Sequence, residues 1–127
     1  MAKILIADDE PQVRSAMAGI LKEGGHDFEE AYDGISALDY LKTYEPDLLL
    51  LDWWIPEIFG GEVLDKIRND PEYEAFKKLP VIVVSDFADE TSLQKFRQAG
   101  ANDFVPKKED LEEFKRLLLE RIDLALK

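Results

Sequence analysis

The chain contains no cysteine and a single histidine, His26. Without thiols there is no disulfide, no thiolate metal site and no cysteine nucleophile, which suits a reducing compartment. His26 follows Gly25 in an expected turn and stands far in sequence from any other candidate ligand, so we expect a surface residue. A metal site in this chain would therefore use oxygen ligands.

Positive charge is scarce as well: 16 Lys and Arg stand against 28 Asp and Glu, a net charge of −12. A surface this negative repels phosphate backbones, so we expect no direct contact with nucleic acid. Apolar runs such as 48–51 are far shorter than the roughly 18 to 20 residues that span a bilayer. We expect no signal peptide and no membrane anchor, and therefore a cytoplasmic protein.

The length of 127 residues and an apolar fraction of 46% fit one folded domain over residues 1–127. Short apolar, β-rich runs alternate with segments in which apolar residues recur every three or four positions. The runs predict strands at 3–7, 28–31, 48–51, 81–84 and 104–105. The periodic segments predict helices around 13–21, 35–41, 63–67, 93–99 and 111–125, the last capped by Asp110. The stretch 71–78 is ambiguous between a linker and a helical turn.

Strict alternation of strand and helix predicts an α/β fold in which five parallel strands are covered by helices on both faces. The simplest arrangement is a doubly wound, flavodoxin-like (βα)5 sheet in strand order 2-1-3-4-5. In such sheets ligands bind beyond the carboxyl ends of the strands, near the point where the strand order reverses. That edge is where we look for chemistry.

Polar side chains follow four of the five strands at this edge. They are Asp8 and Asp9, Asp52, Ser85 and Asp86, and Lys107. Carboxylates gathered in one pocket repel one another, and a hard divalent cation relieves that repulsion. Magnesium prefers oxygen ligands and is commonly held by one or two carboxylates together with a substrate phosphate. An ammonium and a hydroxyl nearby are suitable donors to a phosphoryl group, so the pattern predicts phosphoryl chemistry on Mg²⁺.

The whole chain resembles the receiver domain of bacterial two-component response regulators, of the single-domain chemotaxis type. The markers are Asp8-Asp9, Asp52 within the segment 52–60, Ser85, Gly100-Ala101 and Lys107. Each marker alone is weak, but together they stand at the right ends of the right strands. The resemblance implies that Asp52 accepts a phosphoryl group from a phosphohistidine. It also implies that Asp9, Asp52 and the backbone carbonyl of Trp54 ligate Mg²⁺, with Asp8 acting mainly through water.

The resemblance further implies a conformational switch. Lys107 would pair with the phosphoryl oxygens, Ser85 would move toward them, and Phe104 on the fifth strand would swing inward. The output face would then comprise the fourth helix, the fifth strand and the fifth helix. Implied partners are a sensor histidine kinase or phosphotransfer protein and a downstream effector protein or output domain, with a phosphorylation-dependent dimer as a further option.

Three positions depart from the family pattern. The lysine is usually followed by a proline in a cis peptide, whereas here Lys108 follows Lys107. Because a cis bond before a non-proline residue costs roughly 2.5 to 4 kcal/mol, we predict a trans bond. Asp86 occupies a usually small position and places another carboxylate near the phosphoryl site. Phe104 has no hydroxyl, so it can report a switch only by packing.

Other functions remain open at this stage. In the leading hypothesis the chain is a signalling receiver and not an enzyme, apart from self-phosphotransfer and autodephosphorylation. A pseudo-receiver that binds partners without phosphorylation is the main alternative. A Mg²⁺-dependent phosphatase of the dehalogenase type is less well supported, because such enzymes carry a second Asp where this chain has Trp54. A flavin-binding module is disfavoured by the acidic first loop, which is not a phosphate cradle.

Overall fold

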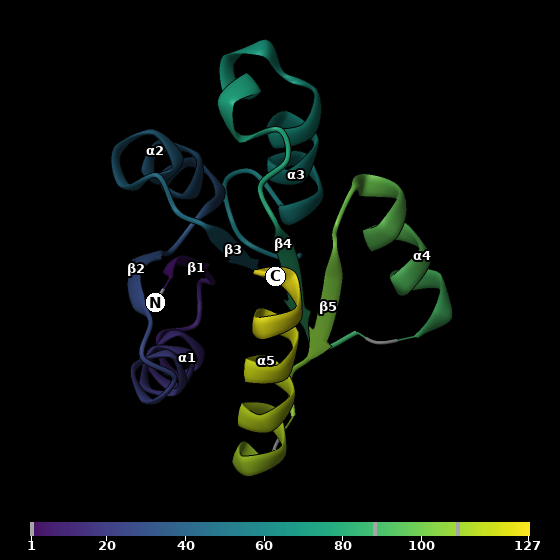
Figure 1. The fold of residues 1–127 in the computed structure, drawn as a ribbon. Helices are drawn as coiled ribbons and strands as arrows, with labels where there is room; N and C mark the ends of the chain where they lie inside the picture. The colour runs from purple at the N-terminus through teal and green to yellow at the C-terminus, as the bar shows by residue number, and fades with distance from the viewer. Residues whose placement is uncertain (1, 88, 109) are drawn as a thin grey trace.

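The computed structural model describes residues 2–87, 89–108 and 110–127. Within them lies a five-stranded parallel sheet (Figure 1). Its strands are β1 (Lys3–Ala7), β2 (Asp27–Ala31), β3 (Leu48–Leu51), β4 (Val81–Ser85) and β5 (Asp103–Pro106). The order β2-β1-β3-β4-β5 confirms the predicted topology.

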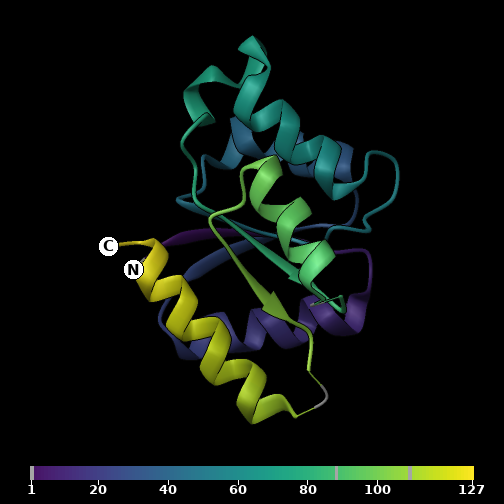
Figure 2. The ribbon, with the colours of Figure 1, turned by 90° about the vertical axis from the view of Figure 1, so that its right-hand side faces the viewer.

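Helices cover both faces of the sheet (Figure 2). One face carries α1 (Pro11–Glu23) and α5 (Leu111–Ala125), and the other carries α2 (Gly34–Tyr44), α3 (Gly60–Asn69) and α4 (Glu90–Ala99). The ambiguous stretch contains a short 3-10 helix over Pro71–Phe76. Each face of the sheet therefore encloses its own apolar core, as expected for a doubly wound fold.

The central strand β3 shows how tertiary context decides between helix and strand. Leucine favours helices, yet all four residues of Leu48–Leu51 are extended and fully buried. Leu48 and Leu50 contribute to the core beneath α1 and α5, whereas Leu49 and Leu51 face the opposite core. The strand pairs with β1 on one side and with β4 on the other. A continuous apolar run is what a strand buried on both faces requires.

Helix starts lie earlier than the apolar periodicity alone indicated. α1 begins at Pro11, where the fixed φ of proline suits the first helical position. α4 begins at Glu90, because the Asp89 side chain accepts a hydrogen bond from the Ser92 backbone N–H (3.2 Å). The predicted cap at Asp110 is confirmed: its carboxylate accepts a bond from the Glu112 N–H (3.0 Å).

Two glycines let the loop between β3 and α3 fold back tightly against its surroundings. A side chain at Gly60 would lie 2.7 Å from the carbonyl oxygen of Asp52, and the Gly60 N–H donates to the Trp53 carbonyl (2.7 Å). A side chain at Gly34, the first residue of α2, would collide with the carbonyl of Ile58. These close approaches fix the loop that follows Asp52.

Candidate functional site

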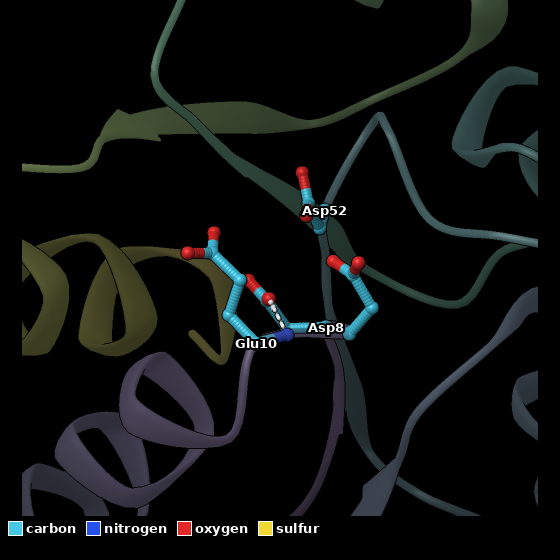
Figure 3. Close-up of side chains that lie close together, drawn as sticks. Asp8, Glu10 and Asp52 are labelled. Carbon is cyan, nitrogen blue, oxygen red and sulfur yellow. Dashed lines mark hydrogen bonds between the residues drawn. The ribbon is translucent and has the colours of Figure 1, made fainter.

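Four carboxylates gather at the carboxyl edge of the sheet. Asp8, Asp9 and Glu10 follow β1, and Asp52 follows β3; Figure 3 shows three of these side chains converging. One oxygen of each lies within 4.8 Å of one oxygen of every other. Asp8 and Asp52 are buried, whereas Asp9 and Glu10 are exposed. The acids predicted to share one rim are therefore close enough for a single cation to bridge them.

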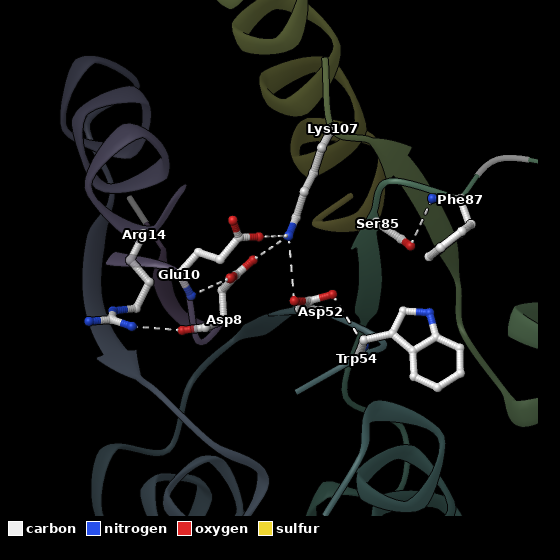
Figure 4. Close-up of polar contacts among 8 residues, drawn as sticks. All are labelled: Asp8, Glu10, Arg14, Asp52, Trp54, Ser85, Phe87 and Lys107. Atoms are coloured by element: carbon white, nitrogen blue, oxygen red, sulfur yellow. Dashed lines mark hydrogen bonds and ion pairs between the residues drawn. The ribbon is translucent and has the colours of Figure 1, made fainter. Parts of the chain in front are cut away.

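Lys107, which follows β5, reaches into this cluster (Figure 4). Its Nζ lies 3.0 Å from Asp8 Oδ2, 3.2 Å from Glu10 Oε1 and 3.4 Å from Asp52 Oδ2. One half-buried ammonium thus faces three carboxylates. The cluster keeps a surplus of negative charge, which is the condition under which a carboxylate site recruits a further cation.

Backbone contacts hold the two buried acids in place. Asp8 Oδ1 accepts a hydrogen bond from the Glu10 N–H (2.9 Å), and the Asp8 carbonyl accepts one from the Arg14 guanidinium (2.9 Å). Asp52 Oδ1 accepts a bond from the Trp54 N–H (3.2 Å). Each carboxylate keeps its other oxygen directed toward Lys107.

The pKa values reflect the crowding. Burial, and then the charge of Asp8, raise the pKa of Asp52 to about 6, against the opposing effect of Lys107. Burial likewise raises the pKa of Asp8. Burial alone would lower the pKa of Lys107, but the close contact with Asp8 and the charges of Asp52 and Asp8 outweigh it, so the net direction is upward. The ammonium is therefore charged at any physiological pH.

The donor set suits a hard divalent cation. All ligand atoms are oxygens, as Mg²⁺ and Mn²⁺ prefer. Asp8 Oδ2 is shielded from solvent and accepts no well-directed hydrogen bond, although it lies within ion-pair distance of Lys107. A buried carboxylate oxygen with capacity to spare is what a metal, or a water bound to it, would satisfy.

A cleft of about 480 Å³ opens above these acids. Ser85 and Asp86, at the end of β4, line its other side together with Trp54 and Phe87. The Ser85 hydroxyl accepts a bond from the Phe87 N–H (3.1 Å), and its carbonyl accepts one from the Lys107 N–H (2.9 Å). Ser85 thus lines the same cleft as the acids, while its hydroxyl is engaged with Phe87, and the exposed Asp86 lies at the mouth of the cleft.

Sequence reasoning missed the role of Glu10 as a partner of Lys107. Its position beside the two aspartates was a usable signal, because residues just after a strand lie at the same edge of the sheet.

Other predictions concern single residues. The Lys107–Lys108 bond is trans, as predicted. His26 lies at the surface, as expected, but is half-buried, and its Nδ1 accepts a hydrogen bond from the Ala2 N–H (3.3 Å). Phe104 is also half-buried and contacts Phe96, with ring centroids 6.4 Å apart.

Comparison with known proteins decides the family. The response regulator receiver domain family matches residues 4–119, almost the whole chain. This chain belongs to that family. Its acidic cluster and lysine thus lie in a receiver domain, the signalling module of two-component systems, and its relatives are named as response regulators.

Individual relatives agree. The receiver domain is 32% identical, over 127 residues, to the DNA-binding dual master transcriptional regulator RpaA of Synechocystis, covering 97% of this chain and 51% of RpaA. The chain thus spans about half the length of the curated relatives it matches. The phosphorylated cyanobacterial phytochrome response regulator RcpA is 26% identical with a TM-score of 0.85, covering 98% of this chain and 94% of RcpA. The Mn²⁺-bound response regulator Rcp1 shares the fold at 24% identity, with a TM-score of 0.83 and coverage of 100% and 96%.

Membership sets the broad expectations for this receiver domain. Receiver domains bind a divalent metal at the acidic pocket. Across the described ranges 2–87, 89–108 and 110–127, none of the helices combines the length and the apolar character needed to cross a bilayer.

Proposed function

We propose that residues 1–127 form one receiver domain operated by phosphorylation of Asp52. One observation carries this proposal: the Asp52 carboxylate lies at the floor of an open cleft, 3.4 Å from a lysine and within 4.8 Å of the acids after β1. A nucleophile, an ammonium group and a set of metal-binding carboxylates thus lie together at one cleft. That combination serves phosphoryl transfer and has no evident structural purpose.

In the proposed reaction a carboxylate oxygen of Asp52 attacks the phosphorus of a phosphohistidine on a sensor kinase or phosphotransfer protein. The new O–P bond forms in line with the breaking P–N bond, whose electron pair stays on the imidazole nitrogen, and that nitrogen takes up a proton from water. The product is an acyl phosphate on Asp52. Attack of one anion on another is slow unless charge is neutralised, and Lys107 is placed to do so. Water later hydrolyses the acyl phosphate, so the domain carries out self-phosphotransfer and autodephosphorylation only.

Asp9, Asp52 and the backbone carbonyl of Trp54 are the residues we propose to hold Mg²⁺, with Asp8 contributing mainly through water. Bound there, the metal would neutralise charge on the transferring phosphoryl group. The exposure of Asp9 leaves its carboxylate free to turn toward the cleft. Mg²⁺ is preferred over a larger cation because so few protein ligands are available and water must complete the set.

The switch is proposed to run through Ser85 and Phe104. The Ser85 hydroxyl would leave the Phe87 N–H and bond to the phosphoryl group, which gives the phosphorylated state a contact that the other state lacks. Phe104 would then pack further inward on β5. The face formed by α4, β5 and α5 would change shape and be read by an effector or by a second copy. With a net charge of −12, this region itself would not contact nucleic acid.

Incubation with Mg²⁺ and acetyl phosphate, followed by intact mass measurement, tests the proposal. We expect one phosphoryl group per chain, slowly lost, absent from Asp52→Asn and retained in Asp123→Asn, which alters an exposed acid on α5. Rapid, repeated turnover of acetyl phosphate would indicate a phosphatase. A complete lack of adduct in a folded sample would favour the pseudo-receiver.

A further inference from the structure

A second hollow lies beside the acidic cleft, between the N-terminal part of α3 and α4. It measures about 490 Å³, and aromatic rings dominate its walls. Three of these rings are largely open to solvent: Trp54 at 60% exposure, Phe87 at 53% and Phe59 at 41%. We call this hollow the aromatic groove. A cluster of large, exposed aromatic side chains is typical of a surface that contacts a partner.

The aromatic rings of the groove pack against one another. The Trp54 ring is stacked with Phe59 at 6.4 Å between centroids and meets Phe87 edge-on at 6.4 Å. Beneath them Trp53 and Phe96 are buried, with centroids 4.8 Å apart. α3 and α4, which flank the groove, lie next to each other on one face of the sheet (Figure 2). A preformed aromatic floor lowers the entropic cost of binding an apolar side chain.

Charge around the groove selects the kind of partner. Among the described lining residues the one charged side chain is Lys95. Exposed acids directly adjoin the lining in sequence: Asp86 precedes Phe87, and Glu62 follows Gly61. The chain as a whole carries −12. An acidic peptide, a nucleic acid or an anionic membrane would therefore be repelled, whereas arginine and lysine would be attracted to both the acids and the ring faces.

We propose that the aromatic groove docks a segment of a partner protein in which an apolar or aromatic anchor is flanked by arginine and lysine residues. This surface shares α4 with the α4–β5–α5 face of the proposed switch, but its other walls come from the loop after β3, from the start of α3 and from Phe87 after β4. Trp54 and Phe87 line both the groove and the acidic cleft, so the bound segment would border Asp52 (Figure 4).

Two synthetic peptides test the proposal. One has a phenylalanine–leucine face with lysine and arginine elsewhere, and its twin carries glutamate at every basic position. Calorimetry and backbone amide shifts are recorded on the full chain without metal or phosphoryl donor. We expect the basic peptide to bind at least about tenfold more tightly and to shift the amides of Trp54 and Phe87. Because no phosphoryl donor is present, failure of the proposed phosphorylation would leave this result untouched.

Variants supply the control. Phe59→Ser should weaken binding about tenfold, whereas Leu124→Ser, which alters a comparably exposed apolar residue on α5, should not change it. Lys95→Glu, at an exposed position where folding is not at risk, should tighten binding of the basic peptide severalfold. Equal binding of the two peptides, no binding of either, or amide shifts confined to another face would overturn the proposal.

Discussion

At the scale of single residues, the Asp52 carboxylate occupies a position where its charge is costly. It is buried beside Asp8, and Lys107 is shared among three acids, so neutralisation is incomplete. The raised pKa of Asp52 records this cost. A site built for stability alone would pair each acid or remove it. Retained repulsion is instead consistent with a site that awaits a cation.

The free-energy cost of the buried Asp52 charge predicts how Asp52→Asn changes stability with pH. Because the folded pKa of Asp52, about 6, exceeds the unfolded value of 3.8, wild-type stability falls as pH rises between about 4 and 6. The asparagine cannot ionise, so the variant should be more stable by on the order of 2 kcal/mol at pH 7, with the gap closing by pH 4. Urea unfolding at both pH values measures this. A variant that is less stable at pH 7 would show that Lys107 already compensates the charge.

Asp86 should slow the approach of an anionic donor. Its carboxylate is exposed at the mouth of the cleft, so Asp86→Ala is expected to raise the rate of phosphorylation by acetyl phosphate about twofold at low salt. Asp123→Ala provides a control with the same change of net charge. If the two variants phosphorylate at the same rate, the side chain of Asp86 has no specific influence on the site.

At the scale of elements, the loop between β3 and α3 depends on the close approach of Gly34 to Ile58. Gly34→Ala should destabilise the protein by about 1 to 3 kcal/mol, because the methyl group would clash with the backbone of Ile58, which moves less easily than a side chain. Gly19→Ala, at an exposed site on α1 with open space around it, should instead stabilise by about 0.5 to 1 kcal/mol. Chemical unfolding compares the two. Equal effects would mean that the loop relaxes around the methyl group.

The elements also show where sequence reasoning succeeds. Continuous apolar runs predicted β3 and β4 because a strand buried on both faces leaves no alternative to apolar residues. The edge strand β2, which is largely exposed and rich in acids, gave a far weaker pattern. The start of α4 was misplaced by a few residues because its cap, Asp89, acts through hydrogen bonds to Ser92, which apolar periodicity does not register.

At the scale of the whole molecule, the strand order brings the ends of β1, β3 and β5 to one rim. Topology alone predicted that Asp8, Asp52 and Lys107 would meet there. It did not predict that Glu10 would share the lysine, since that depends on the first turn of α1 and on the rotamer of one long side chain. The aromatic groove could not be predicted from the sequence either, because two of its walls come from loops, and the periodicity of apolar residues does not describe the paths of loops.

Metal binding should be visible in the stability of the whole molecule. Because a cation bound to the folded state alone stabilises it by mass action, excess Mg²⁺ should raise the melting temperature by several degrees at pH 7. Asp9→Asn should abolish most of that rise while leaving the metal-free melting temperature nearly unchanged, since Asp9 is exposed. Asp39→Asn, an exposed acid on α2, should behave as wild type. An equal rise in all three proteins would indicate non-specific screening.

The most direct test of the central claim is a crystal structure of the protein grown with Mg²⁺ and beryllofluoride. We predict one Mg²⁺ ion bound by Asp9 and Asp52, beryllofluoride attached to an Asp52 carboxylate oxygen, and the Lys107 ammonium paired with its fluorine atoms. An acidic cluster without metal, or beryllofluoride bound elsewhere, would contradict the account.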